Sequence, residues 1–138
     1  MPCYESIGHQ QQESASGSRH LIQGPIVPEG ETWTLTSLAA KNNMDPNRFP
    51  VYRVTAEMSV CVYLPSRQPD HGEISPGEWV LLEGDAEVPQ FKPVIWRGYL
   101  TLPPNAQLGA WFRGADTGDI VELDAVYDVE VEEEGDWE

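Results

Sequence analysis

The chain has 138 residues, enough for one domain that buries roughly two-thirds of the surface of its unfolded form, and too few for a second domain. Its 23 acidic residues against 8 basic residues give a formal net charge of -15 at pH 7, and such a surface repels a phosphate backbone, so we expect no direct binding to nucleic acid. Because the apolar stretches are far shorter than the ~20 residues of a membrane helix and no basic region precedes an apolar one at the N-terminus, we expect neither a membrane anchor nor a standard secretion signal.

Residues 1–19 combine a glutamine run with Ser, Gly and Ala and show almost no apolar periodicity. A segment of this composition buries too little apolar surface to offset the entropy of its own ordering. We therefore expect a flexible N-terminal arm. The arm is either a frayed terminus or a segment that becomes ordered on a neighbouring subunit.

From residue 20 onward, apolar and polar side chains alternate with the period of two that is typical of half-buried strands. Turns that contain proline or glycine separate these segments, and no window of comparable length has the 3.6-residue period of a helix. The strands are expected at residues 20–23, 26–27, 32–38, 54–64, 78–82, 94–102, 108–112 and 121–131.

About eight strands without helical crossovers predict an all-β fold in the form of an antiparallel β-sandwich. We predict a jelly roll, and an immunoglobulin-like sandwich is the alternative that the same pattern allows. The expected organisation is an arm at 1–19, a β-sandwich domain at 20–132 and an acidic tail at 133–138. We expect the acidic last strand to be a sheet edge that its charges protect against stray pairing.

The sequence contains no catalytic motif, so we expect a protein that is not an enzyme and needs no cofactor. It has neither a Gly-x-Ser-x-Gly elbow nor a glycine-rich phosphate loop. The glutamates at 130–134 form a solvated, mutually repelling run rather than the acid pair of a glycosidase. Cys3 and Cys61 lack the short spacing of metal or redox pairs, and both are expected to be free thiols.

Two loops contain possible cation ligands, and for both we favour an explanation without a metal. The acidic residues beside His71 offer at most a weak site in a solvated loop. Asp116, Asp119 and Asp124 could supply oxygen ligands to Ca²⁺, but their spacing is not that of an EF-hand. A hairpin turn, in which Asp and Gly accept unusual φ angles, is the simpler explanation.

Five tryptophans are many for a chain of this length, and an exposed subset could stack against sugar rings. Trp33 and Trp96 are in register with the apolar faces of their strands, which indicates core packing. Trp111 lies opposite Phe112 in the alternation, so we expect it to be exposed or interfacial. Trp111 and Tyr99 are the candidate contacts with a ligand or another subunit.

Residues 26–35, 98–114 and 118–127 resemble small β-sandwich virion proteins of tailed bacteriophages, including capsid decoration proteins. The shared features are a turn before an aromatic strand and a Gly-Asp pair before the terminal strand. The resemblance implies a virion protein that forms a homo-oligomer, often a trimer, binds the major capsid protein and grips its neighbours through extended termini.

Two functional hypotheses follow. The first is a non-enzymatic structural protein of the virion, a capsid decoration or cement protein or another head-surface protein. The alternative is a carbohydrate-binding or receptor-binding module, as on a tail fibre or spike, which would use Trp111 and Tyr99 together with neighbouring acidic residues.

Overall fold

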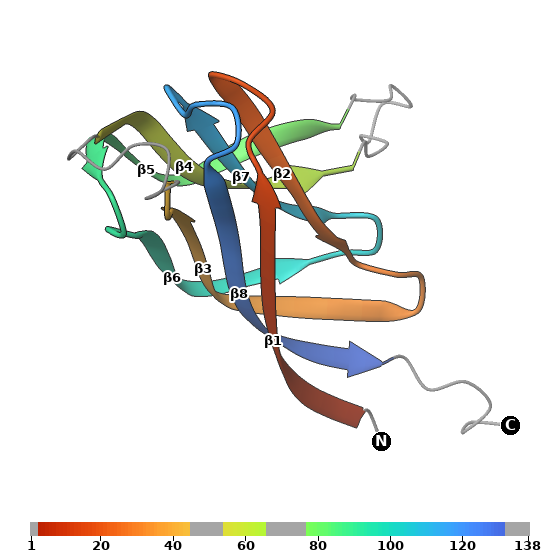
Figure 1. Ribbon diagram of the computed structural model, residues 1–138. Helices are drawn as coiled ribbons and strands as arrows, with labels where there is room; N and C mark the ends of the chain where they lie inside the picture. The colour runs from red at the N-terminus through yellow and green to blue at the C-terminus, as the bar shows by residue number, and fades with distance from the viewer. Residues whose placement is uncertain (1–2, 45–53, 66–76, 132–138) are drawn as a thin grey trace, which may run out of the picture.

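The computed structural model describes residues 3–44, 54–65 and 77–131. The described ranges form eight strands: β1 (Cys3–Ser14), β2 (Arg19–Ile26), β3 (Glu31–Asn42), β4 (Val54–Leu64), β5 (Glu78–Pro89), β6 (Val94–Leu102), β7 (Gln107–Arg113) and β8 (Ile120–Val131). The strands make two four-stranded sheets that face one another (Figure 1), a first sheet of order β1-β8-β3-β6 and a second sheet of order β2-β7-β4-β5.

The pairing scheme is that of a jelly roll. β1 pairs with β8, β2 with β7, β3 with β6 and β4 with β5, so the chain is a long hairpin rolled into two sheets. Every one of these pairs is antiparallel, as are the contacts of β3 with β8 and of β4 with β7. The predictions of an all-β fold and of a jelly roll are therefore confirmed.

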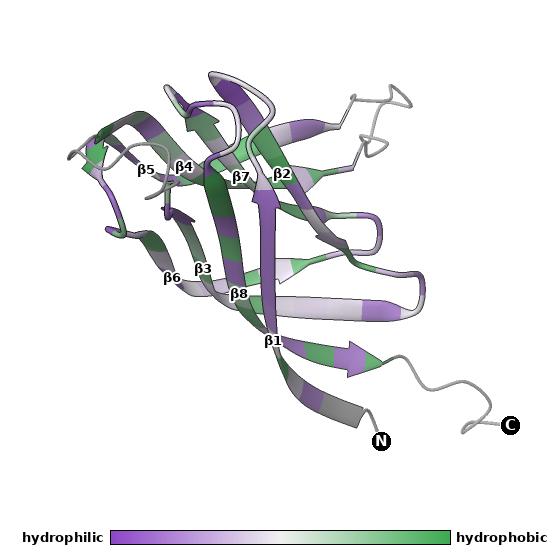
Figure 2. Ribbon diagram, viewed as in Figure 1, coloured by the Kyte–Doolittle hydropathy of each residue, from purple (hydrophilic) through white to green (hydrophobic). Residues whose placement is uncertain are grey.

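The first strand differs from the expected flexible arm. Residues 3–14 pair with β8 along their whole length, from Cys3 opposite Val131 to Ser14 opposite Ile120. β1 is largely hydrophilic (Figure 2), and Ile7 is its one apolar side chain packed against the core among those described. Its ordering entropy is offset by main-chain hydrogen bonds to β8, a partner from the other end of the chain. Composition alone does not reveal such a partner.

The expectation that the last strand is a sheet edge was wrong, because β8 lies between β1 and β3. Its acidic side chains do not meet other acidic strands there, since Glu122 has Gln12 opposite it on one side and Lys41 on the other. The acidic tail at 133–138 and the loop around His71 lie outside the described residues.

Two strand boundaries also differ from expectation. The expected break between residues 20–23 and 26–27 is a bulge inside β2, and a Cβ at Gly24 would lie 2.9 Å from the carbonyl oxygen of Leu108. Only glycine allows this approach of the two backbones. The turn expected at 83–85 is likewise part of β5, where Gly84 pairs with Ser59 of β4.

The core lies between the sheets and contains the inward-facing half of each alternating strand. Trp33, which is 5% exposed, stacks on Tyr127 with ring centroids 4.0 Å apart, and Trp96 packs against the edge of the core, as expected for both tryptophans. Within the described ranges the chain forms no helix that is long and apolar enough to cross a membrane. The largest fully buried side chains include Phe112, Ile22, Leu35, Leu38, Met58, Leu102, Leu108 and Leu123.

Candidate ligand-binding groove

A hollow of about 350 Å³ lies on the outer face of the second sheet. We call it the groove. All four strands of the sheet contribute to it, and its lining is mostly apolar, with one carboxylate and one hydroxyl. The lining residues are Leu21, Glu57, Ser59, Cys61, Trp79, Leu81 and Trp111.

Strand register brings these residues together. Trp111 of β7 has Leu21 of β2 on one side and Ser59 of β4 on the other. One pleat further along, Cys61 of β4 pairs with Leu81 of β5. Since successive side chains point to opposite faces of a sheet, these residues face outward while Phe112 faces the core. The structure thus places Trp111 half-buried in the wall of the groove.

Trp79 forms the second aromatic wall, and a glycine makes room for it. A Cβ at Gly109 would lie 2.5 Å from Cζ3 of Trp79, so the indole lies over the bare backbone of β7. The ring of Tyr63 packs beside it at a centroid distance of 5.5 Å and an angle of 59°. Trp79 remains 36% exposed, and it is therefore a preformed aromatic surface rather than a core residue.

Cys61 lies at the floor of the groove and is buried. Burial raises the pKa of its thiol to about 11, because an apolar environment disfavours the thiolate. The thiol is therefore neutral near pH 7 and is not activated as a nucleophile. The prediction of a free thiol is confirmed for Cys61, and it stays a prediction for Cys3.

One end of the groove is charged. Nη2 and Nε of Arg113 donate to Oε2 of Glu57 at 3.0 and 3.2 Å. Arg113 also lies directly opposite Arg19 of β2. Arg19 and Arg113 are two residues away on their strands from the facing pair Leu21 and Trp111, so the charged row is the next row on the same face of the sheet.

Tyr99, the other residue singled out in the sequence, does not belong to the groove. It is 87% exposed on β6, an edge strand of the first sheet. Its neighbour Leu100 packs against the core, so Tyr99 points away from the core, on the opposite side of the sandwich from Trp111. The two candidate contacts cannot bind one small ligand together.

The aspartates considered for Ca²⁺ form a turn instead. Oδ2 of Asp119 accepts a hydrogen bond from the backbone N–H of Asp116 at 2.9 Å, and the N–H of Asp119 donates to the carbonyl of Asp116. The Asp124 side chain instead forms a hydrogen bond with the side chain of Glu122, also on β8. In residues 3–44, 54–65 and 77–131, no three His, Cys, Asp or Glu side chains are grouped as metal ligands.

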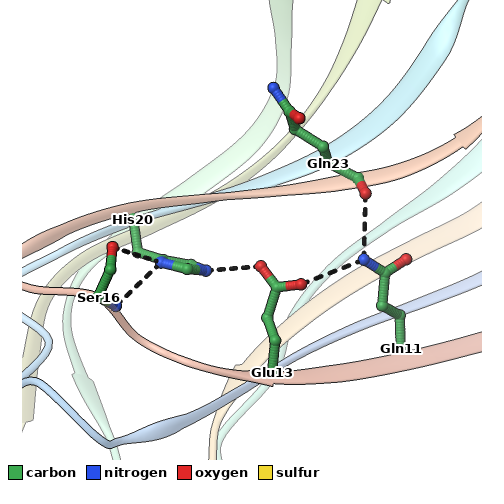
Figure 3. Close-up of polar contacts among 5 residues, drawn as sticks. All are labelled: Gln11, Glu13, Ser16, His20 and Gln23. Atoms are coloured by element: carbon green, nitrogen blue, oxygen red, sulfur yellow. Dashed lines mark hydrogen bonds and ion pairs between the residues drawn. The ribbon is translucent and has the colours of Figure 1, made fainter.

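A polar cluster joins β1 to β2 where the chain passes between the sheets (Figure 3). Nε2 of His20 contacts Oε1 of Glu13 at 2.7 Å, and Nδ1 contacts both the backbone nitrogen and Oγ of Ser16 at 3.2 Å. Ser, His and a carboxylate are the residue types of a hydrolytic triad. In this cluster, however, Nδ1 of His20 faces the Ser16 hydroxyl and also accepts a hydrogen bond from the backbone N–H of Ser16. The nitrogen that would have to take the hydroxyl proton is therefore shared with the backbone of the turn. Nε2 of Gln11 donates to the carbonyl of Gln23 at 3.1 Å, so the cluster anchors β1.

The chain matches no protein-family model and no curated protein sequence. Similar solved structures include PirA, with 9% sequence identity and a TM-score of 0.43 over 86% of this chain and 92% of that chain. The Bacillus endospore appendages that form disulfide-linked pili have 7% identity and a TM-score of 0.43 over 96% of this chain and 92% of that chain. A family 16 carbohydrate-binding module is also similar, with 10% identity and a TM-score of 0.36 over 85% of this chain and 73% of that chain. With TM-scores below 0.5, these likenesses do not bear on function. The strand order itself defines the class, which is a β-sandwich of the jelly-roll type.

Sequence reasoning found one member of the groove, Trp111, and missed the others. Trp79 falls in a short apolar segment that resembles a core strand when it is considered alone. The signal that would have identified it is Gly109, a glycine in the interior of a strand, because such a residue often marks a close approach by another group.

Proposed function

We propose that this protein is a non-catalytic carbohydrate-binding module and that its ligand lies in the groove. The observation that carries the proposal is the pair of tryptophans, Trp79 and Trp111, that line one hollow from different strands. A sugar ring has apolar faces and polar edges. The indoles offer surfaces for the faces, and the Glu57 carboxylate, which is about half exposed, offers hydrogen bonds to the edges.

The exposure of the groove supports a binding role rather than a packing role. Leu81 is 63% exposed and lies on the same face of β5 as Trp79, so apolar side chains of the groove are in contact with water. An exposed apolar patch of this kind marks an interaction site more often than a packing surface. The supports of Trp79, which are Gly109 beneath it and Tyr63 beside it, hold the indole in place before a ligand arrives. A preorganised ring loses little conformational entropy on binding.

The test is a titration of the protein with neutral and acidic oligosaccharides, followed by tryptophan fluorescence. We expect a bound glycan to change the emission, and Trp79→Ala and Trp111→Ala to weaken binding at least tenfold each, as central aromatic contacts do. Tyr99→Ala is the matched control and should bind like the parent, because Tyr99 lies on the other sheet. Absence of any glycan response, or full affinity in both tryptophan variants, would refute the proposal.

The virion role is a second candidate, and the free edge of β1 supports it. β1 is a twelve-residue edge strand with no proline, lysine or register shift, the features that usually protect an edge from pairing with another chain. A strand of a neighbouring subunit could extend the first sheet there. Light scattering should then show a discrete homo-oligomer, with a trimer expected. A monomer at every concentration would remove this candidate.

A further inference from the structure

We infer that the groove binds an acidic sugar, with the sugar carboxylate held by Arg19 and Arg113. This inference rests on the proposed function and specifies the class of its ligand. It starts from the row of charges at the end of the groove, where cations are concentrated in a protein that has few of them.

The two arginines are neighbours across a strand pair. Arg19 of β2 lies directly opposite Arg113 of β7. Both are two residues away from the facing pair Leu21 and Trp111, so their side chains lie on the same outer face of the sheet. Like charges directly opposite each other in a sheet are unfavourable. With 8 basic residues against 23 acidic ones, such a pairing is not the result of an excess of cations.

One of the two charges is balanced and the other is not. Glu57 pairs with Arg113 at 3.0 Å, and both side chains are about half exposed. Within the described residues no carboxylate forms an ion pair with Arg19. The row therefore carries a net charge of +1 and has free guanidinium donors, which fit the two oxygens of a carboxylate.

The positions suit a ring that stacks on Trp111. Residues two apart on a strand are separated by about 6.6–6.8 Å, so the guanidinium row begins about one sugar ring away from the indole. The rest of the molecule is strongly acidic and would repel an anion at long range. At physiological ionic strength this repulsion is screened beyond about 8 Å, whereas the direct contact with arginine is not.

The experiment uses the full chain and a panel of sialylated, uronate-containing, sulfated and neutral oligosaccharides. We expect the carboxylated glycans to bind most tightly, and their methyl esters, which keep the ring but lose the charge, to bind about tenfold more weakly. Arg19→Gln should weaken the carboxylated ligands about tenfold and leave any neutral ligand unchanged. Arg97→Gln makes the same charge change on β6 of the first sheet and should have no effect.

The outcomes separate this inference from the proposed function. If neutral glycans or the methyl esters bind as tightly as the acids, the acidic ligand is wrong and the carbohydrate-binding module stands. If sulfated glycans bind and carboxylated ones do not, the carboxylate assignment is wrong. If Arg97→Gln weakens binding as much as Arg19→Gln, the effect comes from net charge rather than from this site. If no glycan binds, both proposals fail.

Discussion

Phe112→Ala is expected to lower the free energy of unfolding by about 3–5 kcal/mol. The Phe112 ring is fully buried and is among the largest such side chains in the core. It belongs to β7, which lies between β2 and β4, so neighbouring strands on both sides restrict the collapse of the cavity that alanine would leave. Urea denaturation at neutral pH measures the loss, which is a large part of the total stability of an ordinary domain.

Trp111→Ala is the matched control, because it removes a larger side chain from the adjacent position on the opposite face. Trp111 is half-buried in the wall of the groove and has no covering layer in the described part of the chain. We expect its loss to cost no more than about 1 kcal/mol of stability. If Trp111→Ala destabilised the fold as much as Phe112→Ala, the groove would be a structural feature rather than a binding site.

The contrast between these neighbours shows what the sequence could predict. A strand must alternate its side chains between two faces, so the apolar pattern of 108–112 was enough to assign Phe112 inward and Trp111 outward. The partner of Trp111 across the groove is different. Trp79 comes from β5, and its position depends on the registers of β7 with β4 and of β4 with β5. Registers between distant segments cannot be deduced from local periodicity.

The same limit explains the first strand. Gln10 and Gln12 have no apolar pattern to mark them as part of a strand, and among the described residues both side chains donate to Glu122, near the other end of the chain. Local composition indicated a segment unable to order itself, but in the fold residues 3–14 are a strand paired with β8. The tertiary fold supplies the acceptors. Sequence therefore identified the strands with apolar faces and missed the one held mainly by polar contacts.

A pair of carboxyl groups on β8 links these polar contacts to pH. Glu122 has a side chain only 4% exposed, and its oxygens accept from Nε2 of Gln12 at 2.6 Å and Nδ2 of Asn43 at 3.2 Å, with Nζ of Lys41 at 3.8 Å. Asp124 hydrogen-bonds to Glu122.

These contacts shift the two pKa values in opposite directions. Burial pushes the pKa of Glu122 upward, but hydrogen bonds from Asp124, Gln12 and Asn43 outweigh it and hold the value at about 2. Burial, together with the neighbouring Glu122, raises the pKa of Asp124 to about 7. The pair therefore shares one proton across the acidic and neutral range.

The consequence is a stability that falls as the pH rises toward 8. In the unfolded chain Asp124 ionises near pH 4, whereas in the fold it keeps its proton until about pH 7. The stability from that proton is present below pH 4 and is lost as the pH rises through 7, by on the order of 2 kcal/mol after allowance for partial exposure. Glu122 has the opposite effect, and its contribution is lost as the pH falls from about 4.5 toward 2. Together the two groups favour maximal stability near pH 4–5.

Asp124→Asn isolates this effect, because the amide can donate an N–H toward Glu122 and cannot ionise. Unfolding free energies from urea denaturation at pH 5, 6.5 and 8 should fall more steeply for the parent than for the variant. The general repulsion of a protein with a charge of -15 lowers both curves alike, so the difference between them reports the carboxyl pair. Parallel curves would mean that Asp124 ionises normally in the fold, and that β1 is held to β8 without a shared proton.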